Sequence, residues 1–504
     1  MWRSWLGRSA RAGLALLGGI GLSACTEGSG GEGGGGSTPS TTTTPTSSTT
    51  SSSSTTVCTC ATDADCPSNH HCDACQCLPD GNDCPGCVCV PGTKVPCYDG
   101  PPGTENVGVC KVGKHTCADD GLSWGPCEGE VVPQPEACNG LDDDCDGAVD
   151  PDLDGDGWGV CDGDCCDDPS CAADPAAVNI GALEIPNDGV DDDCSPATLD
   201  TDPLAVCSAP LSLDDPPASV SSIDLLKALD LCHFTSESPD LPQKTWGVIS
   251  ASITRADGVL NVEPKPIQKG VLTKYGASVV PLRGETMVAL SSGTARAEGD
   301  PGWVQPQDGG LPGQVGSYDA QTTSGLPVNW LASNGGVVPA GCGLCSGPDC
   351  ATAFDSISLN VRVRVPTNTP KLTFRADLYT AEYPEALCSA SNDFFVTLID
   401  GQAPSPDWPA DRNVALDAAF GPFSVNAATF DVCQGCADSA AQLQGTGMGG
   451  WSGALGDGAA TGWRKIEAPV TPGDTVDLRF VIWDASDHER DSLVLLDDLR
   501  FEAP

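Results

Sequence analysis

The chain has 504 residues, of which 29 are cysteines, and its 70 acidic residues outnumber 24 basic ones, giving a net charge of −46. This charge excludes nucleic-acid binding, because phosphates would be repelled and no basic patch offsets the repulsion. The length predicts two or more domains.

Residues 1–24 have the organisation of an export signal. Three arginines precede an apolar stretch over residues 12–22, and the sequence Leu22-Ser-Ala-Cys25 follows. This order is typical of a signal peptide. It also resembles the bacterial lipobox, in which the cysteine thiol receives a diacylglycerol and becomes the new N-terminus. We therefore expect lipidation of Cys25 to hold the protein on a membrane, since several acyl chains together anchor stably. The alternative is an ordinary signal peptide.

Residues 25–57 are predicted to form a disordered linker. From residue 26 to residue 56 the chain contains only Gly, Ser, Thr, Pro and Glu, a composition that cannot bury a core. Thr26 stands where the lipoproteins that this N-terminus resembles commonly carry Asp for retention in the inner membrane. The expected location is therefore the outer membrane or cell surface of a Gram-negative bacterium.

Residues 58–130 are predicted to be small modules held together by disulfides. They contain thirteen cysteines, but Tyr98 and Trp124 are their only aromatic residues, so burial alone cannot stabilise them. Without Cys25 the cysteine count is even, which favours complete pairing in an exported protein. Zinc at the Cys-x-x-Cys pairs (72/75, 84/87 and 342/345) is the alternative, which an oxidising compartment disfavours.

Residues 131–200 form an acidic repeat. Between residues 136 and 200 the chain has 20 carboxylates and no Lys or Arg. Residues 136–145 (EACNGLDDDC) and 184–194 (EIPNDGVDDDC) are two copies of one pattern, and Asp152-x-Asp154-x-Asp156-Gly lies between them. A repeated loop predicts a repeated ligand site. A multivalent cation would offset the mutual repulsion of the carboxylates.

Calcium is the expected cofactor, because it takes 6–8 oxygen ligands at flexible angles, whereas magnesium needs a stricter geometry. An EF-hand is excluded, since its closing Glu is replaced by Gly163 and no amphipathic helices flank the loop. We expect closure through Asp162, Asp164, Asp167 or Asp168. An unliganded acidic spacer is the alternative. The predicted metal ligands are Asp142, Asp144, Asp146, Asp152, Asp154, Asp156, Asp162, Asp164, Asp167, Asp168, Asp191 and Asp193.

About 65 residues here resemble a metal-binding motif of bacterial secreted proteins with the pattern Glu-x-Cys-Asn-Gly-x-Asp-Asp-Asp-Cys-Asp-Gly. The resemblance implies calcium together with disulfides. Pro186 and the doubled Cys165-Cys166 depart from the pattern, so the pairing expected from the family is open. The disulfide candidates are Cys138, Cys145, Cys161, Cys165, Cys166, Cys171 and Cys194.

Residues 201–504 are predicted to be a globular, mainly β domain. One amphipathic helix is expected over residues 221–232, with Ser222 as its N-cap. Apolar and polar residues then alternate over residues 357–365, 372–378 and 476–482, and a last strand is expected near residues 492–501. Such strands, separated by Gly, Pro and Asn, predict an antiparallel β-sandwich of jelly-roll type.

This domain resembles the choice-of-anchor L domain over most of residues 205–502. The matching pieces include Trp246-Gly-Val-Ile-Ser250, Leu290-Ser-Ser-Gly-Thr-Ala295, Asn392-Asp-Phe-Phe-Val396, Thr461-Gly-Trp463 and Trp483-Asp484. The resemblance implies extracellular display, here from the N-terminal lipid. It does not imply a particular ligand; a carbohydrate or a protein is expected.

No catalytic motif stands out, and we expect no enzyme. There is neither a Gly-x-Ser-x-Gly elbow nor a His-Glu-x-x-His zinc motif. Glu382 with Asp393 or Asp484 could form a glycosidase pair, but no spacing rule supports it. A structural calcium is favoured for these acids, or a carbohydrate contact beside Tyr383, Trp463 and Trp483 unless those aromatics are core. Three functions stay open: a displayed binding or adhesion protein, an exported polysaccharide hydrolase and a structural envelope spacer.

Overall fold

The computed structural model describes residues 62–66, 70–73, 76–79, 87–149, 152–168, 170–198, 200, 207, 220–304, 322–339, 351–417, 421–436, 438, 440–449, 458–486, 488 and 490–504. The chain divides into two compact units, residues 1–85 and 86–504. The predicted lipidation site Cys25 and the predicted linker lie outside the described residues. None of the helices in the described part has the length and apolar character needed to span a bilayer.

The cysteine-rich segment forms short hairpins. In the first unit, β1 (His70–Asp73) pairs with β2 (Gln76–Pro79), and in the second, β3 (Lys94–Cys97) pairs with β4 (Gly113–Thr116), both antiparallel. Disulfides hold this segment and the repeat, as the cysteine count predicted. The bonds described join Cys89–Cys117, Cys97–Cys127, Cys110–Cys145, Cys138–Cys161, Cys165–Cys194, Cys166–Cys171, Cys207–Cys232 and Cys433–Cys436.

All seven predicted disulfide candidates of the repeat are bonded, and one bond leaves the repeat, because Cys145 pairs with Cys110. The doubled cysteines serve different loops: Cys165 bridges the 29 residues to Cys194, and Cys166 closes a loop of five to Cys171. Cys72 and Cys87, from two of the Cys-x-x-Cys pairs considered for zinc, are disulfide-bonded too.

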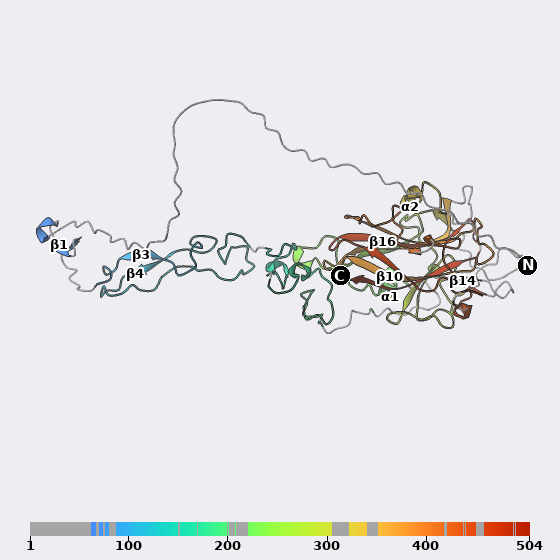
Figure 1. Ribbon diagram of the computed structural model, residues 1–504, viewed down its shortest axis with the longest axis horizontal. Coiled ribbons are helices and arrows are strands. Elements are labelled where there is room, and N and C mark those ends of the chain that lie inside the picture. Colours follow the sequence, from blue (N-terminus) through green and yellow to red (C-terminus); the bar gives the residue numbers. More distant parts are fainter. Residues whose placement is uncertain are drawn as a thin grey trace, which may run out of the picture. The chain divides into compact units, whose positions relative to one another are not determined.

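The C-terminal part is a sandwich of two antiparallel sheets, as predicted (Figure 1). The first, in the order β12-β13-β11-β16-β9-β5 with β8 also paired to β9, comprises Leu416–Asp417, Gly421–Ser424, Phe394–Gly401, Thr475–Ala485, Thr352–Arg364, Gly247–Thr254 and Thr323–Gly325. The second, in the order β14-β10-β17-β7-β6 with β15 also paired to β10, comprises Ala459–Ala460, Lys371–Thr380, Ser492–Glu502, Met287–Ser291, Lys269–Leu272 and Arg464–Pro469.

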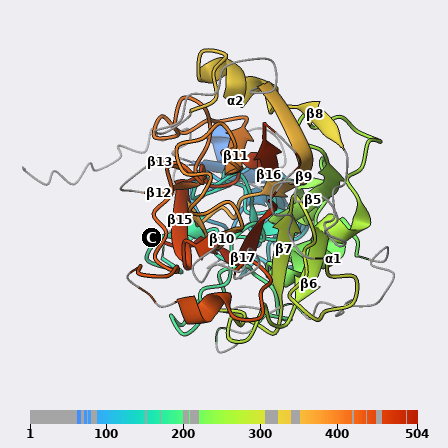
Figure 2. The ribbon, with the colours of Figure 1, turned by 90° about the vertical axis from the view of Figure 1, so that its right-hand side faces the viewer.

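The main core lies between these sheets, which Figure 2 shows as two facing rows of strands. Side chains two apart on a strand point to the same face, and the predicted alternations supply the inward rows. Each row is buried in one cluster: Ile357, Leu359, Val361 and Val363 from β9, Leu372, Phe374, Ala376 and Leu378 from β10, and Val476, Leu478, Phe480 and Ile482 from β16.

The predicted helix is shorter than expected. Helix α1 spans Ser222–Ala228, and its N-cap is Ser221 rather than Ser222. Ser221 Oγ accepts the main-chain N–H of Asp224, and the Asp224 carboxylate accepts the N–H of Ser221, so both ends of a capping box are made. The buried Leu225, Leu226 and Ala228 pack on the core. A second helix, α2 (Val328–Ser333), carries the buried Trp330.

Candidate metal centres in the acidic repeat

The two copies of the repeat fold into the same loop. In the first, Glu136 Oε1 accepts the N–H groups of Asp143 and Asp144, both at 3.1 Å. In the second, Glu184 Oε2 accepts the N–H of Asp192 at 2.9 Å. Each acidic triplet ends in a cysteine with positive φ, 64° at Cys145 and 53° at Cys194. In each copy, the carboxylate of the first residue, a glutamate, is therefore hydrogen-bonded to the main chain of the aspartate triplet at the end of the copy.

These hydrogen bonds bring three carboxylates together in each copy. In each group the ligand oxygens lie within 4.8 Å of one another: Glu136, Asp142 and Asp144 in the first copy, and Glu184, Asp191 and Asp193 in the second. The same positions meet in both copies, which are the opening glutamate and the outer two residues of the triplet.

The loop between the copies builds two more groups. Asp152 accepts the N–H of Gly155 at 2.7 Å and of Gly157 at 2.9 Å, and both glycines have the positive φ that this tight turn requires. Asp154 and Asp156 are thereby turned toward acids further along the chain. The groups are Asp152, Asp154 and Asp167, and Asp154, Asp156 and Asp164, so Asp154 belongs to both.

Several carboxylates in these groups have one oxygen bonded to main-chain N–H and the other without a partner. Asp164 Oδ1, for example, accepts the N–H of Cys166 at 2.8 Å, whereas its buried Oδ2 has no hydrogen bond. The buried, unpartnered carboxylate oxygens of the repeat are Glu136 Oε2, Asp142 Oδ1, Asp154 Oδ2, Asp164 Oδ2 and Glu184 Oε1. All five belong to the four groups, as expected if a cation takes the remaining lone pairs.

The pKa values of the central loop show that its carboxylates are harder to ionise when no cation is bound. Burial, followed by the charges of Asp156, Asp154 and Asp167, raises the pKa of Asp164 to about 6, although its bond from Cys166 lowers it. Burial also raises the pKa values of Asp154 and Asp156. Burial, together with mutual repulsion, thus opposes ionisation of the aspartates in the central loop, and a bound cation would favour it.

The donor chemistry fits a hard cation. Every side chain in the four groups is a carboxylate, and all seven cysteines of the repeat are in disulfides. Oxygen donors of this kind suit calcium, magnesium or manganese rather than zinc or copper(I). The groups could therefore hold a metal ion whose class is set by oxygen ligands.

Nine of the twelve predicted ligands lie in these groups, and Asp146, Asp162 and Asp168 lie outside them. Asp168 is exposed and accepts the N–H and hydroxyl of Ser170 instead. Glu136 and Glu184 are in the groups but were not among the predicted ligands. Their shared position at the start of both copies was the available signal.

The acids considered in the sandwich are buried rather than displayed. Glu382, Asp393 and Asp484 are 0–1% exposed. Trp483, considered for carbohydrate contact, stacks on Phe394 with ring centroids 5.2 Å apart and is core. Trp463 is partly buried against a second apolar cluster.

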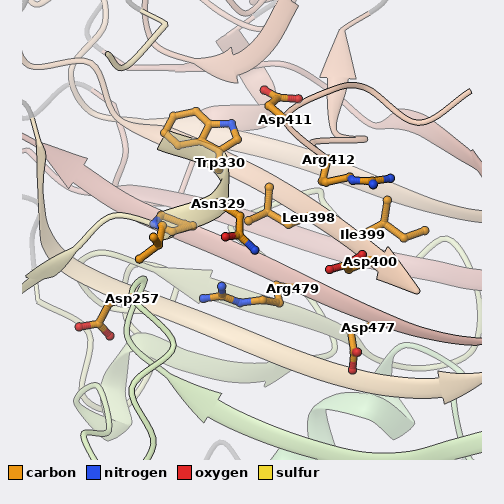
Figure 3. Close-up of a pocket in the computed structure, with 12 residues that line it drawn as sticks. Asp257, Asn329, Trp330, Leu398, Ile399, Asp400, Asp411, Arg412, Asp477 and Arg479 are labelled. Atoms are coloured by element: carbon orange, nitrogen blue, oxygen red, sulfur yellow. The ribbon is translucent and has the colours of Figure 1, made fainter. Parts of the chain in front are cut away.

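A cavity of about 330 Å³ lies beneath α2, on the outer face of the sheet that contains β16 (Figure 3). Two of the charged side chains that line the cavity already form hydrogen bonds within the protein. Arg479 donates to Asn360 Oδ1 and to the carbonyl of Ala256, and Asp477 accepts from Arg362 at 2.6 Å. This arrangement points to no ligand class.

Comparison with known protein families, curated proteins and solved structures finds no match for this chain.

Proposed function

We propose that this protein is a lipid-anchored envelope protein in which a calcium-stabilised repeat supports a displayed β-sandwich that binds a ligand. The observation that carries the proposal is the set of four carboxylate groups with unpartnered inward oxygens. Calcium is the proposed ion, because it accepts many carboxylate oxygens at irregular angles, whereas magnesium keeps several waters and demands octahedral geometry.

The anchor and the display are supported by the sequence. The lipobox-like residues ending at Cys25, the glycine- and serine-rich stretch that follows, and the resemblance to the choice-of-anchor L domain agree on an exported protein held at a membrane. The outer membrane or cell surface of a Gram-negative bacterium is the proposed location.

The proposed role of the sandwich is binding or adhesion, with a carbohydrate or a protein as ligand. A glycan array probed with the full chain, with and without calcium, tests the carbohydrate. Turnover of cell-wall or matrix polysaccharide would instead establish a hydrolase.

Calcium binding is tested on the full chain by calorimetry and limited proteolysis. Binding to the folded state alone raises the free energy of unfolding by RT ln(1 + [L]/Kd), about 2.7 kcal/mol at a hundredfold excess over Kd. We expect a chelator to open residues 131–200 to protease, within the limits that the disulfides set. Absence of calcium heat at millimolar ion, with the same cleavage pattern in chelator, would reduce the repeat to a spacer.

A further inference from the structure

The apolar core between the sheets ends in two carboxylates of the seven-stranded sheet, one on β16 and one directly before β11. On β16, Asp484 stands two positions after Ile482 and continues its inward row. Next to it, Asp393 stands two positions before the inward-facing Phe395 of β11. Both aspartates are 0% exposed. The main-chain N–H of Ala485 donates to Asp393 Oδ1 at 3.1 Å, which ties the two strand ends together.

The facing sheet ends in hydroxyls at the same place. Ser292 follows the inward Leu290 of β7 by two positions, and Ser492 precedes the inward Val494 of β17 by two. Both serines are 0% exposed. Ser492 Oγ donates to Asp393 Oδ2 at 2.6 Å, so the polar ends of the two sheets meet. Four strands thus enclose one buried set of oxygen atoms.

Asp484 is the unsatisfied member of this set. Both of its carboxylate oxygens are buried without a hydrogen-bond partner. The nearby hydroxyl of Ser292 favours the ionised form of Asp484, but it donates to the main-chain oxygen of Ser492, at 3.2 Å. The neighbours whose charges act most strongly on Asp484 are Asp393, Asp491 and Asp355, all acidic.

In the described part of the chain, no cation is among the groups that act most strongly on Asp484. His488 Nδ1 lies 2.7 Å from Asp355 Oδ2 and is committed to that carboxylate. The Asp491 carboxylate is pressed against Gly293, where any Cβ would collide with it. An ionised carboxylate buried without donor or counter-ion is strongly disfavoured, so Asp484 needs either a cation or a proton.

We propose that Asp484 and Asp393 bind a divalent cation of the calcium class between the two sheets. In the described part of the chain, groups of three carboxylates within 4.8 Å occur in the repeat alone. The ligands here are accordingly two carboxylates together with neutral oxygens, for which the hydroxyls of Ser292 and Ser492 lie beside the two aspartates. Calcium accepts such mixed oxygen shells. This site is separate from the proposed centres of the repeat.

The test counts calcium ions bound to the full chain by native mass spectrometry. Asp484→Asn keeps the shape of the side chain and removes its charge, so it should lower the count by one ion. The matched control is Asp377→Asn. Asp377 is also 0% exposed in a strand of the sandwich, but its oxygens accept from Tyr379 and Thr461, so its variant should keep the full count.

An Asp484→Asn chain that keeps every ion would overturn the proposal and leave Asp484 a protonated carboxyl. If that variant does not fold, a crystal of the unaltered chain soaked in Mn²⁺ decides: an anomalous peak beside Asp484 supports the site, and a map without one refutes it. Asp154→Asn should retain this ion. Failure of the repeat to bind calcium is therefore distinguishable from failure of this inference.

Discussion

Asp154 is the residue on which the central loop of the repeat depends, because it belongs to two carboxylate groups at once. Its Oδ1 accepts the N–H of Asp156, and its buried Oδ2 has no partner. Asp154→Asn should weaken calcium binding at both groups, by about tenfold or more, which corresponds to about 1.4 kcal/mol.

Calorimetric titration of the full chain measures this loss. The matched control is Asp168→Asn. Asp168 follows Asp167 directly in the sequence but lies outside both groups, and its exposed carboxylate accepts from Ser170 instead. Equal affinities for the two variants would contradict the placement of the ion at Asp154.

Asp377 should make the stability of the sandwich depend on pH. Burial raises its pKa from 3.8 to about 7, although bonds from Tyr379 and Thr461 lower it. Between these pH values the folded chain holds a proton that the unfolded chain has released. The free energy of unfolding should therefore fall as pH rises from about 4 to 7, by up to about 1.4 kcal/mol per pH unit for this group.

Denaturant unfolding at fixed calcium, from pH 5 to pH 8, measures that slope. Asp377→Asn has no proton to lose, and its slope should be flatter than that of the unaltered chain. Identical slopes would show that Asp377 does not titrate in this range.

The sequence shows where the acidic residues of the repeat lie, but it does not show which of them come together as metal ligands. The alternation of Asp152, Asp154 and Asp156 is local, and a single turn brings these residues together. Which later acid completes each group depends on the path of the chain after Asp156. In the structure this path brings Asp164 and Asp167 to the loop. That path is set by disulfides such as Cys165–Cys194, whose pairing no spacing rule gives.

At the scale of elements, the N-cap of α1 is one residue earlier than predicted, because Ser221 rather than Ser222 makes the cap. Ser221→Ala should lower the free energy of unfolding of the sandwich by about 1 kcal/mol, since it removes the acceptor for the Asp224 N–H.

Ser222→Ala is the comparison variant. The Ser222 hydroxyl makes one bond, to the carbonyl of Ala251 at 3.3 Å, and caps nothing. Chemical denaturation of both variants should show the larger loss for Ser221→Ala. A larger loss for Ser222→Ala would return the cap to the position that the sequence alone favoured.

The strands were predictable because one face of each carries a regular apolar row. The other faces were harder to predict, because loops cover them. Tyr379, Leu493 and Leu495 point away from the main core, yet they are buried in a second cluster with Tyr275 and Val432. Alternation reports which face is apolar, but it does not show that a distant loop will cover the other face.

At the scale of the whole second unit, the repeat is joined to the sandwich by specific contacts. Leu183 packs on the main core, and its main-chain N–H and carbonyl both bond the side chain of Asn368. The side chain of Asn179 donates to Asp156 Oδ2 at 2.6 Å and accepts from Thr367 Oγ1 at 2.8 Å. One amide therefore connects a candidate metal ligand to the sandwich.

Calcium should consequently stabilise the sandwich as well as the repeat. In differential scanning calorimetry, we expect the ion to raise the sandwich Tm in the unaltered chain and to raise it less in Asn179→Ala. The lost bonds are worth about 1–3 kcal/mol together. Asn334→Ala, which removes bonds to Trp330 and Asp411 far along the chain from the repeat, should leave the calcium effect intact. A calcium shift of unchanged size in Asn179→Ala would contradict this coupling.

The proposed anchor is tested in cells. Cys25→Ser should abolish acylation, because a hydroxyl cannot form the thioether, and the variant should either leave the membrane fraction or stay unprocessed. Fractionation with mass analysis of the N-terminus measures both results. A processed Cys25→Ser chain that still sediments with membranes would rule out the lipid.

The disulfides of the repeat also fix how far this part of the protein can be stretched. Fully extended, the main chain from Cys110 to Cys194 would measure about 290 Å. The bonds Cys110–Cys145, Cys138–Cys161 and Cys165–Cys194 offer a shorter covalent route, with Cα–Cα steps of 6.0, 5.0 and 5.5 Å. With the short chain pieces between them, this route reaches about 55 Å at full extension. Under a pulling force, tension would follow the cysteines, and most of the acidic loops would carry none of the load.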